Sequence, residues 1–293
     1  MKILITGGAG YIGSHTCLQI LKAQHDVMVY DNLSNSAPTA MARVKQLANA
    51  DFAFCQGDIQ DAGALDQVFA DFKPQAVVHF AGLKAVGEST TQPLDYYGQN
   101  VAGTVTLLNT MQRHGCGAIV FSSSATVYGE AIYLPFDEDH PLQPANPYGR
   151  TKYFIEEIIR DWAASWDQAS GVILRYFNPV GADPSGHIGE DPFGIPNNLV
   201  PYIAQVAVGR LPQLQVFGDD YDTRDGTGER DYIHVQDLAR AHLAALEYAT
   251  THKGCEAINV GTGRGATVLE MVQAFERAAG RPIAYDIAPR RAG

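Results

Sequence analysis

A tyrosine and a lysine stand four residues apart in the segment Tyr148-Gly149-Arg150-Thr151-Lys152. If the segment is helical, the two side chains share one face of the helix. An ammonium group beside a phenol stabilises the phenolate and lowers the pKa of the phenol from its usual value of about 10. The phenolate could then take a proton from a substrate hydroxyl while a hydride leaves the same carbon atom. The pattern also arises by chance, so it needs a second observation.

Three consecutive serines, Ser122 to Ser124, supply that observation because they follow a run of strand-forming residues. A serine at the carboxyl end of a sheet strand can hydrogen-bond the same substrate hydroxyl. Turn formation alone would also explain serines at this point. It would not explain their combination with Tyr148 and Lys152, and the three groups together predict a proton-transfer site.

A glycine-rich loop follows the first strand-like segment, with glycines spaced as G-x-x-G-x-x-G at Gly7, Gly10 and Gly13. Glycines allow the backbone to turn tightly and to approach a pyrophosphate, which then lies at the positive end of the following helix. Glycine-rich turns are common, but this one stands at the first strand–helix junction of a β-α-β unit. The loop therefore predicts a dinucleotide site.

Two aspartates follow the next strand-like segments and refine the choice of dinucleotide. Asp31 ends the second segment, where a carboxylate can accept hydrogen bonds from both ribose hydroxyls of NAD and repels the 2′-phosphate of NADP. A turn or helix cap is the alternative role for Asp31. Asp58 follows the third segment and suits the edge of the adenine. We predict NAD as the cofactor.

The elements that position these residues alternate regularly over the first 176 residues. The predicted strands are Lys2–Thr6, Asp26–Tyr30, Phe52–Gln56, Ala76–His79, Ala118–Ser122 and Val172–Tyr176. Between them lie segments of helical periodicity, which include Ile12–Ala23, Leu65–Phe72 and Val101–Arg113. Short apolar strands that alternate with helices indicate β-α-β units, and right-handed crossovers then give a doubly wound, Rossmann-like parallel sheet of the α/β class.

The alternation stops after Tyr176. Residues 177–229 are rich in Gly, Pro, Asp and Asn, with one predicted helix at Leu199–Gly209, and a strand and helices return from Asp231 onward. We expect an NAD-binding domain over residues 1–178, with its sheet continued by residues 231–261. Residues 179–293 would form a smaller, interleaved α/β substrate domain.

Composition excludes several classes of protein. Hydrophobic residues make up 46% and charged residues 18%, which is typical of a globular chain rather than a disordered or fibrous one. The net charge of −11 disfavours nucleic acid and anionic membrane surfaces as partners. The four cysteines form no C-x-x-C pair and the nine histidines show no ligand spacing, so no metal site is predicted. No secretory signal and no apolar run of the ~20 residues of a membrane span is found, and we expect a cytoplasmic protein.

With the glycine loop, Ser124, Tyr148 and Lys152 in this order, the chain resembles the extended short-chain dehydrogenase/reductase family. Longer strings narrow the resemblance to its sugar-nucleotide epimerases. These strings are His79–Ser89, Ser122–Gly129, Arg175–Ala182, Gly189–Gly209 and Gly226–Val235. The resemblance covers the whole chain, and the last three strings are the most specific because they concern the substrate side.

The resemblance implies reversible epimerisation at C4 of UDP-galactose and UDP-glucose, through a 4-keto sugar and with NAD that stays bound. It makes Tyr148 the base, Lys152 its electrostatic partner and Ser124 the hydrogen-bonding helper. For NAD it implies the glycines of the loop with Tyr11, Ile12, Asp31, Asn32, Leu33, Asn35, Ser36, Asp58, Ile59, Phe80, Ala81, Lys84 and Phe177. For the UDP-hexose it implies Asn178, Asn198, Leu199, Phe217, Arg230 and Arg291.

The chain departs from the family pattern at two places. Gln99 stands where some relatives have an asparagine near NAD, and Asn100 follows it, so either residue could make that contact. The sequence ends at Gly293 inside a motif that relatives continue, and we expect the substrate domain to be truncated there.

Three alternatives remain open. A 4,6-dehydratase of the same fold would need an acidic pair beside the catalytic serine, where this chain has Ser123 and Ala125. A simple NAD-linked reductase predicts net turnover of the cofactor, and a non-catalytic NAD-binding protein predicts binding without any change in a sugar nucleotide. The segments Asn100–Arg113 and Tyr148–Trp162 are predicted as long helices with apolar faces, and the resemblance implies that they pair in a homodimer.

Overall fold

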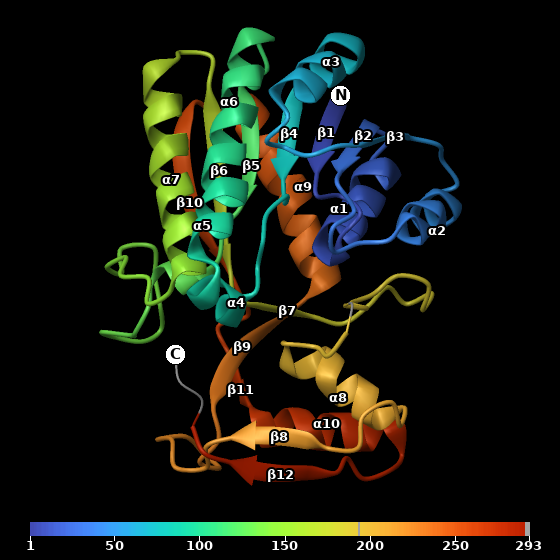
Figure 1. Cartoon of the computed structure of the whole chain (residues 1–293), viewed down its shortest axis with the longest axis vertical. Helices are drawn as coiled ribbons and strands as arrows, with labels where there is room; N and C mark the ends of the chain where they lie inside the picture. The colour runs from blue at the N-terminus through green and yellow to red at the C-terminus, as the bar shows by residue number, and fades with distance from the viewer. Residues whose placement is uncertain (193, 291–293) are drawn as a thin grey trace.

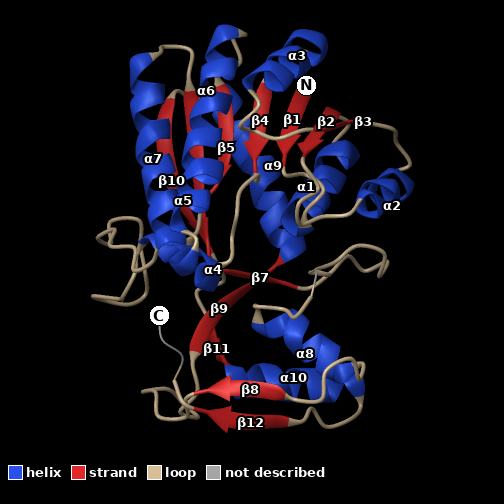
Figure 2. Ribbon diagram, viewed as in Figure 1, coloured by secondary structure: helices blue, strands red, loops and turns tan. Residues whose placement is uncertain are grey.

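The computed structural model describes residues 1–192 and 194–290. Its larger part is built on a seven-stranded parallel sheet (Figures 1 and 2). The strand order is β10 (Gly254–Val260), β6 (Ser170–Tyr176), β5 (Ala118–Ser122), β4 (Ala76–His79), β1 (Lys2–Thr6), β2 (Asp26–Asp31) and β3 (Ala53–Gln56). The fold class predicted from the alternation of strands and helices is confirmed.

Helices cover both faces of this sheet, because alternate residues of each strand point to opposite sides and both sides are apolar. Ile3 and Ile5 face α1 (Tyr11–Lys22), α2 (Pro38–Ala48) and α9 (Val235–Thr251). Leu4, between them, faces α3 (Ala62–Phe72), α6 (Gly103–Arg113) and α7 (Pro147–Ser165). The buried aliphatic side chains of each face form a separate hydrophobic cluster.

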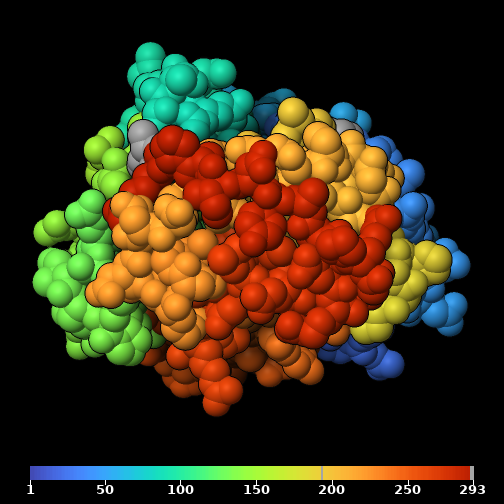
Figure 3. All heavy atoms as spheres, turned by 90° about the horizontal axis from the view of Figure 1, so that it is seen from below, coloured from blue at the N-terminus to red at the C-terminus, as the bar shows by residue number. Residues whose placement is uncertain are grey.

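The smaller part lies beyond the carboxyl ends of the strands (Figure 1). It contains β7 (Asn178–Val180), β8 (Leu214–Phe217), β9 (Glu229–His234), β11 (Gly265–Thr267), β12 (Tyr285–Ala288), α8 (Leu199–Ala207) and α10 (Val268–Ala279). Its own core packs α8 and α10 onto β8 and the segment that leads into β12 through Ile203, Val216, Val272 and Ile283. In the view from below, the C-terminal residues cover the centre of the surface, and the N-terminal residues are visible only at its edges (Figure 3).

Two elements differ from the sequence prediction. The strand expected at residues 231–235 does not join the large sheet: β9 pairs with β7 and β11 instead. The chain leaves the large sheet at Phe177, β7 then pairs with β9, and β10 returns to the large sheet beside β6.

The predicted helix Asn100–Arg113 begins differently as well. Two short helices, α4 (Val86–Thr91) and α5 (Pro93–Tyr96), run into a π-helical segment, Tyr97–Ala102, before α6 starts at Gly103. Wide turns of this kind occur frequently at functional sites. Here the wide turn contains Gln99 and Asn100, the two residues whose roles the sequence left open.

Candidate active site

The position of Tyr148 is set by the start of α7. The Asn146 side chain accepts a hydrogen bond of 2.9 Å from the Gly149 backbone N–H, and Pro147 fills the first helical position. An asparagine cap followed by proline is a strong signal for a helix start. Tyr148 and Lys152 therefore lie on consecutive turns of one helix face, as the spacing predicted.

The end of β5 faces this turn of α7. The Lys152 ammonium donates a hydrogen bond of 2.7 Å to the Ser122 carbonyl oxygen and lies 5.8 Å from the centre of the Tyr148 ring. The Ser124 side chain hydrogen-bonds the Tyr148 hydroxyl. The structure thus brings Ser124, Tyr148 and Lys152 together, although Ser124 and Tyr148 are separated by a long loop.

Burial governs the protonation of both groups. It lowers the pKa of Lys152 to about 8, and the nearby carboxylate of Glu156 acts in the opposite direction. Burial raises the pKa of Tyr148 to about 12, and the hydrogen bond with Ser124 partly offsets this effect. Lys152 is therefore a cation at neutral pH, whereas Tyr148 is a phenol that needs further positive charge nearby to act as a base.

The glycine loop leads into α1 at the carboxyl end of β1. A Cβ atom on Gly13 would lie 2.4 Å from the Gly7 carbonyl oxygen and 2.7 Å from Gly8 Cα, so only glycine fits there. Gly7 adopts a left-handed φ of 70°, which also favours glycine. No side chain caps the N-terminus of α1. Its first amides and the helix dipole are therefore available to an anion, which fits a pyrophosphate.

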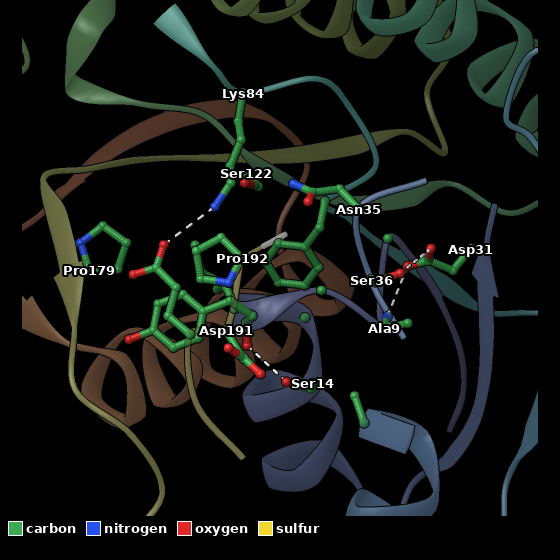
Figure 4. A pocket seen from close by; sticks show the side chains of 18 of the residues that line it. Ala9, Ser14, Asp31, Asn35, Ser36, Lys84, Ser122, Pro179, Asp191 and Pro192 are labelled. Carbon is green, nitrogen blue, oxygen red and sulfur yellow. Dashed lines mark hydrogen bonds and ion pairs between the residues drawn. The ribbon is translucent and has the colours of Figure 1, made fainter. Parts of the chain in front are cut away.

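Asp31 lies beside this loop at the end of β2. Its Oδ2 accepts a hydrogen bond of 2.9 Å from the Ala9 N–H, and its Oδ1 accepts from the Leu33 N–H and the Ser36 hydroxyl (Figure 4). The carboxylate thereby ties the glycine loop to the β2 turn.

These residues line one continuous cleft of about 1150 Å³, at the carboxyl ends of six of the sheet's strands. The residues predicted for catalysis and for the cofactor that line it are Gly7, Gly10, Tyr11, Ile12, Gly13, Asp31, Asn32, Asn35, Ser36, Ile59, Phe80, Ala81, Lys84, Phe177, Ser124, Tyr148 and Lys152. A cleft at this edge of a doubly wound sheet is the usual place for a ligand.

Leu33, Asp58 and Asn100, which were also predicted for the cofactor, do not line the cleft. Leu33 has a left-handed φ of 60° and offers its backbone N–H to Asp31. Asp58 accepts hydrogen bonds from Asn32 and from Gln99, and of these residues Asn32 and Gln99 line the cleft.

Asn100 is buried and bonds both the N–H and the carbonyl oxygen of Leu83, at 2.7 and 3.0 Å. It thus anchors the loop that carries Lys84. The two adjacent residues therefore differ in role. Gln99 lines the cleft, whereas Asn100 holds the backbone of the loop at Leu83.

Of the residues predicted to bind the substrate, some line the cleft and others do not. Asn178 and Asn198 line the cleft. Leu199, the first residue of α8, Phe217, at the end of β8, and Arg230, on β9, lie outside its lining. Arg291 lies outside the described residues.

Several groups of the cleft were not predicted from the sequence, and the most prominent is Glu190. Its Oε1 accepts a hydrogen bond of 2.9 Å from the Asn198 amide and lies 3.6 Å from the Lys84 ammonium (the dashed line from Lys84 in Figure 4). Tyr176, Thr126 and Arg43 also line the cleft. Glu190 stands in the string that begins at Gly189, so its place in that string was the signal that could have singled it out.

In the described ranges, 1–192 and 194–290, no group of three or more His, Cys, Asp or Glu side chains is arranged to hold a metal ion. Over the same ranges, no helix combines the length and the apolar character required to cross a bilayer.

A family model described as the NAD dependent epimerase/dehydratase family matches residues 3–261. The chain belongs to this family. Among curated relatives of the family, the UDP-glucose 4-epimerase of Bacillus subtilis is 56% identical over 293 residues, which are all of this chain and 86% of that protein. The human UDP-glucose 4-epimerase is 54% identical over 299 residues, again with all of this chain and 86% of the relative covered.

Solved structures of the NAD dependent epimerase/dehydratase family give the same result. The UDP-glucose 4-epimerase of Bifidobacterium longum, crystallised with NAD+ and UDP, superposes with a TM-score of 0.97 at 50% identity. The match covers all of this chain and 88% of that structure. The resemblance found in the sequence motifs is confirmed.

Proposed function

We propose that this protein binds NAD and interconverts UDP-galactose and UDP-glucose at C4 of the hexose. The observation that carries the proposal is that Ser124, Tyr148 and Lys152 line the same cleft as the glycine loop. The identity of 54–56% to UDP-glucose 4-epimerases over the whole chain supports the same substrate.

The described residues fit NAD in two ways. The space left by Gly7 and Gly13 and the uncapped start of α1 suit the pyrophosphate. Asp31, which lines the cleft beside the glycine loop, would accept hydrogen bonds from the ribose hydroxyls, and its charge disfavours a 2′-phosphate. Phe80, Lys84 and Phe177 continue along the cleft toward Tyr148 and would hold the nicotinamide half.

Bound NAD supplies a positively charged ring that accepts a hydride from C4 of the hexose and returns it. Tyr148 takes the proton of the 4-hydroxyl as the hydride leaves, and returns it when the ketone is reduced. Lys152, a fixed cation at neutral pH, stabilises the phenolate, and Ser124 orients the substrate hydroxyl. Inversion requires that the 4-keto sugar turn over between the two transfers, so the sugar must be held loosely and the UDP firmly.

We expect the UDP group to be held by the smaller part of the chain. Asn178 and Asn198 already line the cleft. Arg230 and Arg291 remain the residues proposed for the diphosphate, because a guanidinium group bonds phosphate oxygens in a fork. Leu199 and Phe217 remain proposed contacts of the nucleotide.

The geometry disfavours a dehydratase. That reaction needs an acid–base pair beside Ser124, but Ala125 has no such group and the Ser123 hydroxyl is buried and bonded to Glu156 at 2.5 Å. Elimination of water from the sugar therefore has no acid beside the serine to assist it.

Proton NMR of UDP-galactose incubated with the purified protein, without added NAD, tests the proposal. We expect the anomeric signal of UDP-glucose to appear, because the protein carries its own cofactor through purification. Absence of that signal from a protein that contains NAD would contradict epimerisation and favour a non-catalytic NAD-binding role. Net accumulation of reduced cofactor in proportion to the sugar would indicate a dehydrogenase instead.

We also propose a homodimer that pairs the outer faces of α6 and α7, which lie side by side in Figure 1. Val105 on α6 and Phe154 on α7 are large apolar residues, 38% and 43% exposed. Apolar residues that recur on neighbouring helices are typical of an interface between copies of a chain. Sedimentation should give twice the chain mass of 31.7 kDa at micromolar concentration.

Phe154→Arg should convert the dimer to a monomer. Ile132→Arg, an equally drastic change at an exposed apolar residue outside these helices, should leave the dimer intact. A wild-type protein that sediments only as a monomer at this concentration would rule the dimer out.

We propose that the protein lies in the cytoplasm, since its four cysteines are free thiols.

A further inference from the structure

A buried ion pair lies directly behind the proposed catalytic groups. Glu156 is on α7 one turn after Lys152, and Arg175 is on β6; both are almost completely buried. Arg175 Nε lies 3.1 Å from each carboxylate oxygen of Glu156, and Nη2 lies 2.6 Å from Oε2. Burial of such a pair is costly unless the geometry is good and the remaining lone pairs are satisfied.

Two further groups face Glu156. The Ser123 hydroxyl donates a hydrogen bond of 2.5 Å to Oε1, and the Arg160 guanidinium, one turn further along α7, lies 3.8 Å from Oε2. Each of the three consecutive serines thus faces a different residue of α7. The Ser124 side chain bonds Tyr148, the Ser122 carbonyl oxygen accepts from Lys152, and the Ser123 hydroxyl donates to Glu156. These three contacts fix the end of β5 against α7.

Arg175 anchors the pair to the rest of the molecule. Its Nη1 donates to the Tyr128 hydroxyl at 3.1 Å, and that hydroxyl donates to Asn259 Oδ1, on β10, at 2.6 Å. Four elements, β5, α7, β6 and β10, are therefore joined through hydrogen-bonded side chains. Two apolar side chains of similar volume would fill the same space, but they would not fix the position of the serines relative to the helix.

We propose that Glu156, held by Arg175 and bonded to Ser123, is a positioning residue for the proton transfer. It sets the alignment of Ser124 with Tyr148 and of Ser122 with Lys152, and its negative charge keeps Lys152 an ammonium. The inference rests on the proposed function, because it takes Tyr148 as the base. The sign of the charge effect agrees with the geometry: Glu156 raises the pKa of Lys152 against the effect of burial.

Two substitutions distinguish the effect of Glu156 on the alignment of the serines from the effect of its charge on Lys152. Ser123→Ala removes one hydrogen bond and leaves the ion pair intact, so we expect a folded protein with kcat lowered about tenfold and KM within about twofold of the wild type. Glu156→Gln keeps the shape and removes the charge. The pKa of Lys152 then falls, so the ammonium loses its proton at lower pH, and the alkaline limb of the profile of kcat against pH moves down by about one pH unit.

The matched control is Glu157→Gln, because Glu157 is the next residue of α7 but is exposed and pairs with Arg160 at 3.4 Å. We expect kcat and the pH profile of this variant to equal those of the wild type. If Glu156→Gln alone does not fold, the double variant Glu156→Gln/Arg175→Met removes both charges and takes its place. A change in thermal stability with unchanged kcat and pH profile in Ser123→Ala and the Glu156 variant would show a merely structural role and overturn the proposal.

A second readout does not depend on turnover. Carbon-13 NMR titration of the lysine side chains, with the Lys152 signal assigned by its loss in Lys152→Met, reports the ionisation of Lys152 itself. The midpoint should fall in Glu156→Gln and stay in place in Glu157→Gln. If the wild type fails to epimerise UDP-galactose, the proposed function fails while this titration still decides the inference; an unmoved midpoint in an active enzyme refutes only the inference.

Discussion

Replacement of Tyr148 by phenylalanine is expected to lower kcat by about 10³-fold or more, at the upper end of the contribution of a general base. The substitution removes only the hydroxyl oxygen, which hydrogen-bonds Ser124 and would take the proton of the substrate hydroxyl. The ring stays between the same neighbours, so NAD should remain bound. Turnover is measured by NMR of the sugar nucleotide, and NAD by its release from the denatured protein.

Tyr153→Phe is the matched control, because Tyr153 lies on the same helix, with its ring tilted against that of Phe154, and does not line the cleft. We expect this variant to turn over at the wild-type rate. Near-normal turnover of Tyr148→Phe would eliminate Tyr148 as the base, and loss of NAD from that variant would show that its hydroxyl serves cofactor binding instead.

Gly13→Ala is expected to remove NAD from the purified protein. The added Cβ would lie 2.4 Å from the Gly7 carbonyl oxygen and 2.7 Å from Gly8 Cα, and both are backbone atoms that cannot move without opening the loop. Overpacking of this kind costs about 1–3 kcal/mol of folding stability. The displaced loop should also lose its fit to the pyrophosphate, and each 1.4 kcal/mol of lost binding energy is about a tenfold loss of affinity.

The measurement is the molar ratio of NAD to protein after purification, together with the thermal unfolding temperature. Gly228→Ala provides the comparison, since a Cβ there meets no atom within 4 Å. That protein should keep its NAD and its unfolding temperature. Full NAD occupancy in Gly13→Ala would refute the assignment of the glycine loop to the pyrophosphate.

The sequence by itself determined the features that depend on local spacing. The strands Lys2–Thr6, Ala76–His79 and Ala118–Ser122 have the predicted bounds, because each is a short apolar run closed by turn-forming residues. The positions of Tyr148 and Lys152 on one face of α7 follow from helical periodicity alone. The doubly wound architecture follows from the alternation of these elements, and family membership follows from the longer strings of the sequence.

Only the tertiary structure decided which of the adjacent residues Gln99 and Asn100 faces the cleft. Gln99 and Asn100 are equivalent polar residues in the sequence, yet Gln99 lines the cleft and Asn100 is buried against Leu83. The direction of each side chain depends on the π-helical turn between α5 and α6, and a single turn with i→i+5 hydrogen bonds is too short to leave a recognisable pattern in the sequence.

Contacts between segments that are distant along the chain likewise could not be predicted from the sequence. Glu190 meets Lys84 across the cleft, Glu156 meets Ser123 and Arg175, and β9 pairs with β7 rather than with the large sheet. Each of these contacts joins residues from different elements, and their distance is set by how the helices and strands pack. Spacing along the chain determines which side chains share a face, whereas packing determines what that face meets.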